Sequence, residues 1–119
     1  MKHTIDCPAE RAIYFLGGKW KIRILFSLLN NKKIRFGELK KGLKTITQQM
    51  LSKQLKELET DGIVNRKVYQ VVPPKVEYSL TEFGTSVMPI LKSFSEWNKR
   101  NTRTIALKLN KHFEENRIR

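Results

Sequence analysis

The spacing of apolar residues predicts a chain that begins with two helices. Apolar positions recur every three or four residues through 8–16 and 19–29, which places them on one side of each helix. Pro8 suits a first helical turn because its missing N–H needs no partner there. Gly17-Gly18 ends the first helix. The positions expected to be buried are Ala12, Ile13, Phe15, Leu16, Trp20, Ile24, Leu25, Leu28 and Leu29.

A fourth helix has the clearest signals at both of its ends. Before it come a polar turn at 30–33, a very short strand at 34–36 and a third helix at 37–43 that ends near Gly42. Thr47 is a suitable N-cap, and Gly62 is placed to end the helix after about 14 residues. One buried stripe at i, i+4 and i+7 is expected from Leu51, Leu55 and Leu58.

After Gly62 the apolar period changes from helical to alternating. Residues 63–70 and 75–80 are predicted strands, joined by a Val-Val-Pro-Pro turn that cannot lie inside a sheet. Thr81 then caps a final long helix, which we expect to bend at Pro89. The apolar positions of that helix are Phe83, Val87, Leu91, Phe94, Trp97, Ile105, Leu109 and Phe113.

This order of elements predicts a mainly α fold with a small β-hairpin wing, the winged helix-turn-helix (α-α-β-α-α-β-β-α), followed by a long C-terminal helical region. A length of 119 residues with 39% apolar residues supports one core. We therefore expect one domain over 1–119. Within it, 7–80 is the predicted DNA-binding core and 81–119 the predicted helical dimerisation region.

Cysteine, histidine and hydropathy restrict the remaining classes. Cys7 is the single cysteine, so the chain has neither an internal disulfide nor a multi-cysteine metal cluster. His3 and His112 lie at opposite ends, so we expect no metal. No apolar run approaches the roughly 18 residues of a membrane span, and the start does not resemble a signal peptide. These features predict a cytoplasmic protein that does not enter a membrane.

Catalysis finds no support in the sequence. Gly18-Lys19 could belong to a phosphate-binding loop, but Trp20 stands where Ser or Thr is required and Ile13 where the first Gly is required. No histidine lies near a candidate nucleophile in the sequence. We expect a protein that is not an enzyme and needs no cofactor.

Charge points to a polyanionic partner. The formal net charge is +13, and residues 19–75 contain 14 Lys and Arg against 4 Asp and Glu, a net of +10. Such a concentration of positive charge in the middle of the chain favours binding to nucleic acid.

The fourth helix and the hairpin supply candidate DNA contacts. Gln can pair with the edge of adenine, and Ser and Lys can reach base acceptors or phosphates. The outward residues near the start of the helix are Thr47, Gln48, Gln49, Ser52, Lys53 and Lys56. The expected wing and backbone contacts are Arg35, Arg66, Lys67 and Lys75. Duplex DNA is favoured because RNA binders usually display stacking aromatics. The alternatives are a winged-helix protein-interaction module and a basic RNA-binding accessory protein.

The sequence resembles the HxlR-type winged helix-turn-helix transcriptional regulators of bacteria, from Cys7 to about Trp97. The matching segments are Cys7-Pro8, Gly17-Gly18-Lys19-Trp20, Arg35-Phe36-Gly37-Glu38-Leu39, Met50-Leu51, Leu55-Lys56-Glu57-Leu58-Glu59, Asp61-Gly62-Ile63-Val64 and Val72-Pro73-Pro74-Lys75-Val76-Glu77-Tyr78-Ser79-Leu80-Thr81. The resemblance implies a homodimer that reads operator DNA. Gln48, Gln49, Ser52 and Lys53 would read the major groove, and Lys75 would act from the wing.

Two further expectations concern assembly and control. The final helix has more apolar surface than a small domain can cover, so we expect a homodimer interface formed by Phe94, Trp97, Ile105, Leu109 and Phe113. The family resemblance implies a dimer built from the first and last helices, which adds Pro8 to this interface. Some regulators of this family sense oxidants or electrophiles through a cysteine at the position of Cys7. A helix start and Arg11 favour the thiolate there, while Asp6 and Glu10 oppose it. Ordinary packing of Cys7 is the alternative.

Overall fold

The computed structural model describes residues 6–118, and the chain divides into two compact units, Met1–Val87 and Met88–Arg119. The elements of the N-terminal unit are α1 (Pro8–Tyr14), α2 (Lys21–Asn30), β1 (Ile34–Arg35), α3 (Phe36–Leu43), α4 (Gln48–Thr60), β2 (Val64–Tyr69), β3 (Lys75–Leu80) and α5 (Glu82–Ser86). The C-terminal unit contains α6 (Met88–Arg100) and α7 (Thr102–Ile118).

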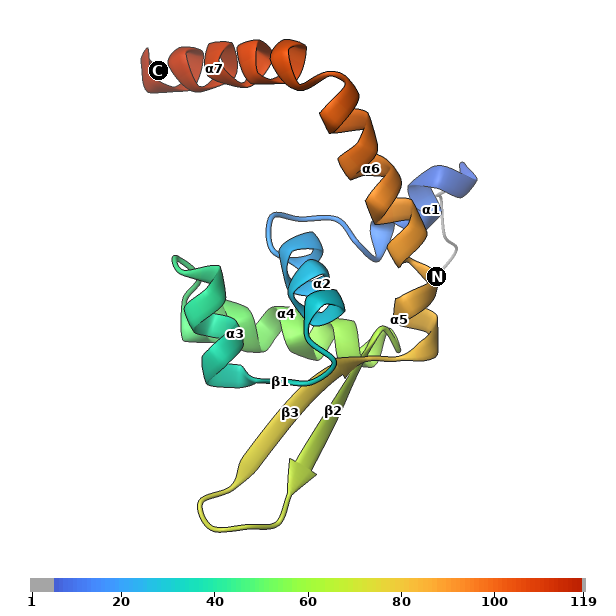
Figure 1. The fold of residues 1–119 in the computed structure, drawn as a ribbon, viewed down its shortest axis with the longest axis vertical. Coiled ribbons are helices and arrows are strands. Elements are labelled where there is room, and N and C mark those ends of the chain that lie inside the picture. The colour runs from blue at the N-terminus through green and yellow to red at the C-terminus, as the bar shows by residue number, and fades with distance from the viewer. Residues whose placement is uncertain (1–5, 119) are drawn as a thin grey trace. The chain divides into compact units, whose positions relative to one another are not determined.

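The N-terminal unit has the winged helix-turn-helix architecture that the sequence predicts. Its three strands form an antiparallel sheet in the order β1-β3-β2, and the β2–β3 hairpin extends away from α2, α3 and α4 (Figure 1). Val64 pairs with Leu80 at the base of the hairpin, and Tyr69 pairs with Lys75 near its tip. The predicted strand at 75–80 is confirmed at both of its ends. Phe36 was expected at the end of the strand at 34–36, but it is the first residue of α3.

The core of this unit lies between α2, α3, α4 and the base of the sheet. The predicted stripe of α4 is confirmed, because Leu51, Leu55 and Leu58 are all buried. They join a core of further fully buried side chains from α2, α3, β2 and the residue before β2, namely Ile24, Leu25, Leu39, Ile63 and Val64. Gly62 has φ +75°, a left-handed backbone that glycine adopts readily, and it turns the chain from α4 into β2.

The predicted burial of the first helix is wrong. α1 ends at Tyr14, and none of its residues is buried. Ala12, Ile13 and Phe15 are exposed and Leu16 is half-buried. The apolar spacing correctly indicated a helix, but spacing cannot say whether the rest of the same chain provides a surface that covers it. Trp20 and Leu29, also expected in the core, are half-buried.

The single long C-terminal helix that the sequence predicted is also wrong. Thr81 caps only the short α5, the chain then leaves the helix at Val87, and α6 and α7 are separated at Asn101. Pro89 is the second residue of α6 and has no N–H to donate to the carbonyl of Thr85, four residues earlier in α5. The interruption at Val87 thus falls next to Pro89, where the sequence predicted a bend. At the second break the Asn101 side chain donates to the Trp97 carbonyl oxygen at 2.9 Å.

The connection from β3 to α5 passes very close to the end of α4. The Thr81 hydroxyl accepts a hydrogen bond from the Gly84 N–H at 2.9 Å, and the Thr81 N–H donates to the Ile63 carbonyl oxygen at 3.1 Å. Gly84 is buried so closely against Ile63 that a Cβ atom there would overlap with the Ile63 carbonyl oxygen. Only glycine fits this position without a shift of backbone.

We predict that Gly84→Ala destabilises the protein by about 1–3 kcal/mol, the usual cost of overpacking a closed site. The matched control is Gly42→Ala in α3, where an added Cβ meets nothing within 4 Å. That control should be neutral or slightly stabilising, because alanine favours a helix interior. Urea denaturation of the two variants and the parent measures the difference. Equal midpoints for Gly84→Ala and the parent would contradict the close approach.

Candidate nucleic-acid interface

α4 presents a continuous polar and basic face opposite its buried stripe. Thr47 caps the helix as predicted, because its hydroxyl accepts from the Met50 N–H at 3.1 Å. The six predicted contact residues at this helix are all exposed: Thr47, Gln48, Gln49, Ser52, Lys53 and Lys56. The free N–H groups of the first turn add positive potential at the same end. The face can therefore offer amide, hydroxyl and ammonium groups to base edges or phosphates.

A strained turn sets α4 against α3. Lys44 has φ 63° and ψ −76°, and the Thr45 N–H donates to the Leu43 carbonyl oxygen at 2.8 Å. These values define a γ-turn with positive φ at its centre, a rare backbone for a residue with a side chain. Ile46 follows and is buried, which anchors the connection to the core. The sequence indicated a turn over 44–46 but neither the γ-turn nor the buried Ile46.

An ion pair between α2 and α4 holds the other side of α4. The Lys21 ammonium lies 2.9 Å from a Glu57 carboxylate oxygen, and the Lys21 side chain is only 11% exposed. Its hydrogen bond and positive charge, helped by Lys53, hold the pKa of Glu57 below its ordinary value, although burial opposes the shift. Glu57 therefore remains charged beside Lys21. This buried lysine, which stands directly after Trp20, was not among the predicted site residues.

The wing carries its predicted basic residues in two different environments. Arg66 and Lys67 are exposed, whereas Lys75 is half-buried and lies 3.5 Å from the Glu77 carboxylate. The ammonium groups of Lys67 and Lys75 each lie 4.8 Å from the centre of the Tyr69 ring. Lys75 is thus half-buried and paired with Glu77 within the wing, whereas Arg66 and Lys67 are exposed and form no ion pair among the described residues.

Glu77 is the acidic centre of this wing cluster. The Tyr69 hydroxyl, then the positive charges of Lys75 and Lys33, hold the pKa of Glu77 below its ordinary value against the effect of burial. The same carboxylate raises the pKa of Tyr69. Lys33 comes from the turn before β1 and was not among the predicted site residues. The sequence places Lys33 in the Asn-Asn-Lys-Lys turn. It was therefore counted in the positive charge of residues 19–75, but no contact was predicted for it.

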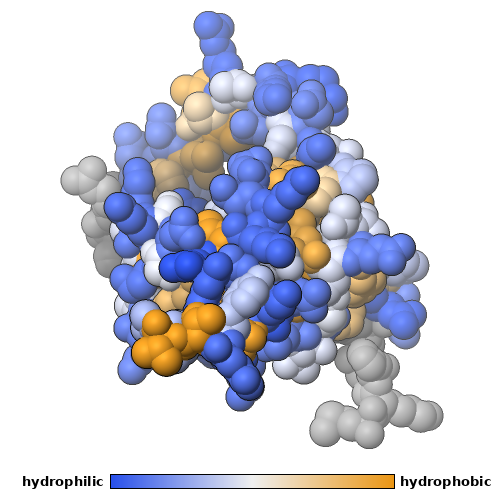
Figure 2. Space-filling view, turned by 60° about the horizontal axis from the view of Figure 1, so that its bottom comes forward, coloured by the Kyte–Doolittle hydropathy of each residue, from blue (hydrophilic) through white to orange (hydrophobic). Residues whose placement is uncertain are grey.

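A hollow of about 360 Å³ separates α4 from the wing. Ser52, Lys56 and Glu59 line it from α4, and Arg66 and Tyr78 line it from the strands. Arg35 is exposed at the start of α3 and lies opposite Glu77 in the register of β1 and β3. Seen from the wing side, the molecular surface is mostly hydrophilic (Figure 2). The structure thus brings the predicted residues of α4, β1, β2 and β3 onto neighbouring elements of one unit.

The predicted dimerisation residues of the C-terminal unit are mostly open to solvent. Phe94 and Trp97 are exposed and, with Ile90 and Ser93, line a shallow apolar hollow on α6. On α7, Leu109 and Phe113 are exposed and Ile105 is half-buried. In the N-terminal unit, Pro8 is exposed and Cys7 is an exposed free cysteine in extended backbone directly before α1.

The described residues contain no cluster of three or more His, Cys, Asp or Glu that could hold a metal ion. Among their helices, none combines the length and the hydropathy needed to cross a membrane. The geometry instead defines a helix-turn-helix with a basic wing.

Comparison with known proteins gives the family of this chain. The model of the HxlR-like helix-turn-helix family matches residues 15–106. The HTH-type transcriptional regulator BH0655 of Halalkalibacterium halodurans is 48% identical over 101 residues, which cover 85% of this chain and 89% of the relative. YdeP of Bacillus subtilis is 49% identical over 94 residues, which cover 79% and 73%.

Solved structures agree with this assignment. The redox regulator HypR in its reduced form superposes with a TM-score of 0.80 at 46% identity, over 84% of this chain and 98% of that one. The reduced form of YodB from B. subtilis gives 0.71 at 36% identity, over 81% and 94%. The chain belongs to the HxlR-like helix-turn-helix family. It is a transcriptional regulator of the winged-helix class and not an enzyme.

Proposed function

We propose that this regulator binds operator DNA as a homodimer, with α4 in the major groove and the β2–β3 wing along the sugar–phosphate backbone. The observation that carries the proposal is the exposed polar face of α4, whose orientation the buried leucine stripe fixes. Gln48, Gln49 and Ser52 face bases, and Lys53 and Lys56 face bases or phosphates. Arg35, Arg66, Lys67 and Lys75 anchor the backbone.

The first prediction is binding to duplex DNA that weakens steeply with salt. A dimer that neutralises on the order of 8 phosphates should lose about 10³- to 10⁵-fold in affinity between 50 and 200 mM salt, because counterions are released on binding. Fluorescence anisotropy with a labelled duplex from the regulator's own upstream region measures this slope. A single-stranded RNA of equal length is the control. No affinity for the duplex at low salt, or a preference for the RNA, would refute the proposal.

The second prediction separates base reading from backbone anchoring. Gln49→Ala and Ser52→Ala should weaken binding to the operator more than binding to random duplex DNA, by roughly 1–3 kcal/mol where a bidentate base contact is lost. Arg66→Gln should weaken both duplexes alike and reduce the salt slope by about one. Lys92→Gln, an exposed lysine on α6, is the matched control for lost charge. The division of roles fails if both classes of variant act equally on operator and random DNA.

We also propose that the C-terminal unit and α1 form the dimer interface. Phe94, Trp97, Leu109 and Phe113 are exposed aromatic and aliphatic side chains, and Pro8 and Ile105 belong to the same proposed interface. Large apolar side chains exposed together commonly mark a surface that a partner covers. Two-fold symmetry would place two α4 helices about one DNA turn apart, as operator reading requires.

Cys7 is the proposed redox site. Its thiol is exposed, and similar proteins include HypR, solved as a redox regulator in its oxidised form, and YodB, solved after diamide treatment. Since Cys7 is the single cysteine of the chain, oxidation can join it only to a second molecule. That molecule is the partner subunit's copy or a small thiol. A bond at the start of α1 would alter the spacing of the two α4 helices.

The third prediction tests interface and thiol together. Under reducing conditions light scattering should give a mass near twice 14.0 kDa. Diamide should then produce a covalent dimer on a non-reducing gel, with a change in operator affinity that dithiothreitol reverses. Cys7→Ser should keep the mass and operator affinity but lose the response. A stable monomer would refute the dimer, and operator affinity that is unchanged by diamide would refute the sensing role of Cys7.

A further inference from the structure

Lys21 is the only charged residue that is buried among the described residues, and it stands at the start of α2. Its side chain is 11% exposed, and its ammonium lies 2.9 Å from a Glu57 carboxylate oxygen. A cation with so little surface cannot serve as a phosphate contact in the way that the exposed lysines of α4 can. Any effect of Lys21 on DNA binding must therefore pass through Glu57, the α4 residue that it contacts.

Lys53 is the basic neighbour of Glu57 on α4 itself. Side chains three or four positions apart are neighbours on a helix, and of the four residues at this spacing from Glu57 only Lys53 is basic. The charge of Lys53 already helps to hold the pKa of Glu57 below its ordinary value. Among the described residues, however, no ion pair of 4 Å or less includes Lys53. Lys21, Lys53 and Glu57 line one hollow of about 520 Å³, which leaves Lys53 room to approach the carboxylate.

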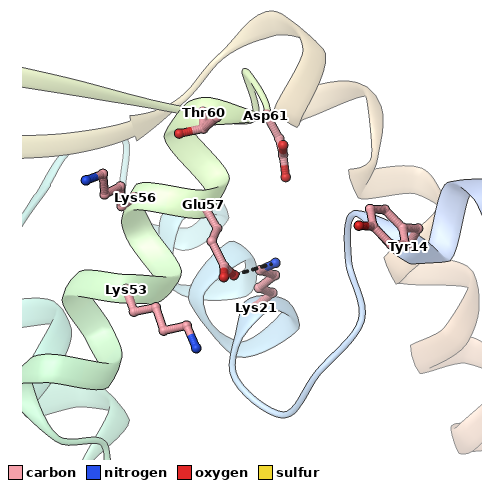
Figure 3. Close-up of a pocket in the computed structure, with 7 residues that line it drawn as sticks. All are labelled: Tyr14, Lys21, Lys53, Lys56, Glu57, Thr60 and Asp61. Atoms are coloured by element: carbon pink, nitrogen blue, oxygen red, sulfur yellow. Dashed lines mark ion pairs between the residues drawn. The ribbon is translucent and has the colours of Figure 1, made fainter. Parts of the chain in front are cut away.

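One carboxylate thus faces two cations, and it is paired with the one that comes from α2. Figure 3 shows the Glu57 side chain directed toward Lys21, with Lys53 nearby on α4 and Lys56 pointing away. We propose that Lys21 is a positioning residue for DNA binding: it holds the Glu57 carboxylate toward α2 and so leaves the Lys53 ammonium available to a phosphate. This inference rests on the proposed function, in which Lys53 contacts DNA.

The binding test uses Lys21→Met, which removes the charge and keeps an apolar stem in the buried position. The unpaired Glu57 carboxylate should then attract Lys53 and repel phosphates. We expect the affinities for operator and random duplex DNA both to fall by about two- to fivefold, the value of one exposed ion pair. Lys92→Met, which removes the same charge from an exposed position on α6, is the matched control. An equal loss in the two variants would overturn the proposal.

Removal of the carboxylate separates this role from simple support of α4. The double variant Lys21→Met/Glu57→Gln should regain the affinity of the parent, because no carboxylate then competes for Lys53. Glu57→Gln alone keeps a hydrogen-bond acceptor for Lys21 and should bind duplex DNA as tightly as the parent or more tightly. A double variant that binds as weakly as Lys21→Met would overturn the proposal. Weaker binding by Glu57→Gln would do the same, and that variant decides the question even where Lys21→Met does not fold.

A measurement without DNA keeps this inference separate from the proposed function. NMR titration follows the Glu57 carboxyl group in the parent and in Lys21→Met, each with and without Lys53→Gln. Loss of Lys53 should raise the pKa of Glu57 more in Lys21→Met than in the parent, because Lys53 is then the ion-pair partner of the carboxylate. Equal rises would overturn the exchange of partners. A larger rise together with no binding of duplex DNA by the parent at low salt would refute the proposed function but leave the exchange in place.

Discussion

The burial of Leu51, Leu55 and Leu58 is the constraint on which the rest of the site depends. These three side chains are at most 2% exposed, so α4 cannot rotate about its axis without bringing one of them into water. Each such exposure costs roughly 1.5–3 kcal/mol. At about 100° of rotation per residue, a fixed buried stripe also fixes the direction of every other side chain of the helix. Gln48, Gln49, Ser52 and Lys53 therefore face outward as a consequence of packing, without any contact of their own.

The same core determines where the wing begins. Gly62 reverses the chain after α4, and Ile63 and Val64 are buried at once on the same core. Thr81 and Gly84 then bind the return strand to Ile63 through the threonine cap and a contact that admits no Cβ atom. The base of the hairpin is thereby attached to the end of α4. Its tip is built differently, since charge and aromatic contacts among Lys67, Lys75, Tyr69 and Glu77 replace apolar burial there.

The sequence predicts well those structural features that depend only on residues close together in the chain. Thr47 is a cap because its own hydroxyl reaches the Met50 N–H, and the limits of 75–80 follow from alternation between Pro74 and Thr81. What sequence missed depends on distant partners. Lys21 is buried because Glu57 lies opposite it, 36 positions away in the chain, and the exposure of Ile13 reflects a surface that the described residues do not cover. Asn101 ends α6 without a proline or glycine, so neither of the usual helix breakers marked that break.

α4 presents different faces to the core, to α2 and to solvent, and these three environments explain why the helix carries both acidic and basic residues. Leucines face the core, Glu57 faces Lys21 on α2, and the lysines face solvent on either side of Glu57. Lys53 and Glu57 are one turn apart, so the carboxylate that holds α4 to α2 also weakens the potential of a lysine that is proposed to contact DNA. Because Lys21 neutralises Glu57 from within the fold, Lys53 keeps most of its attraction for an anion.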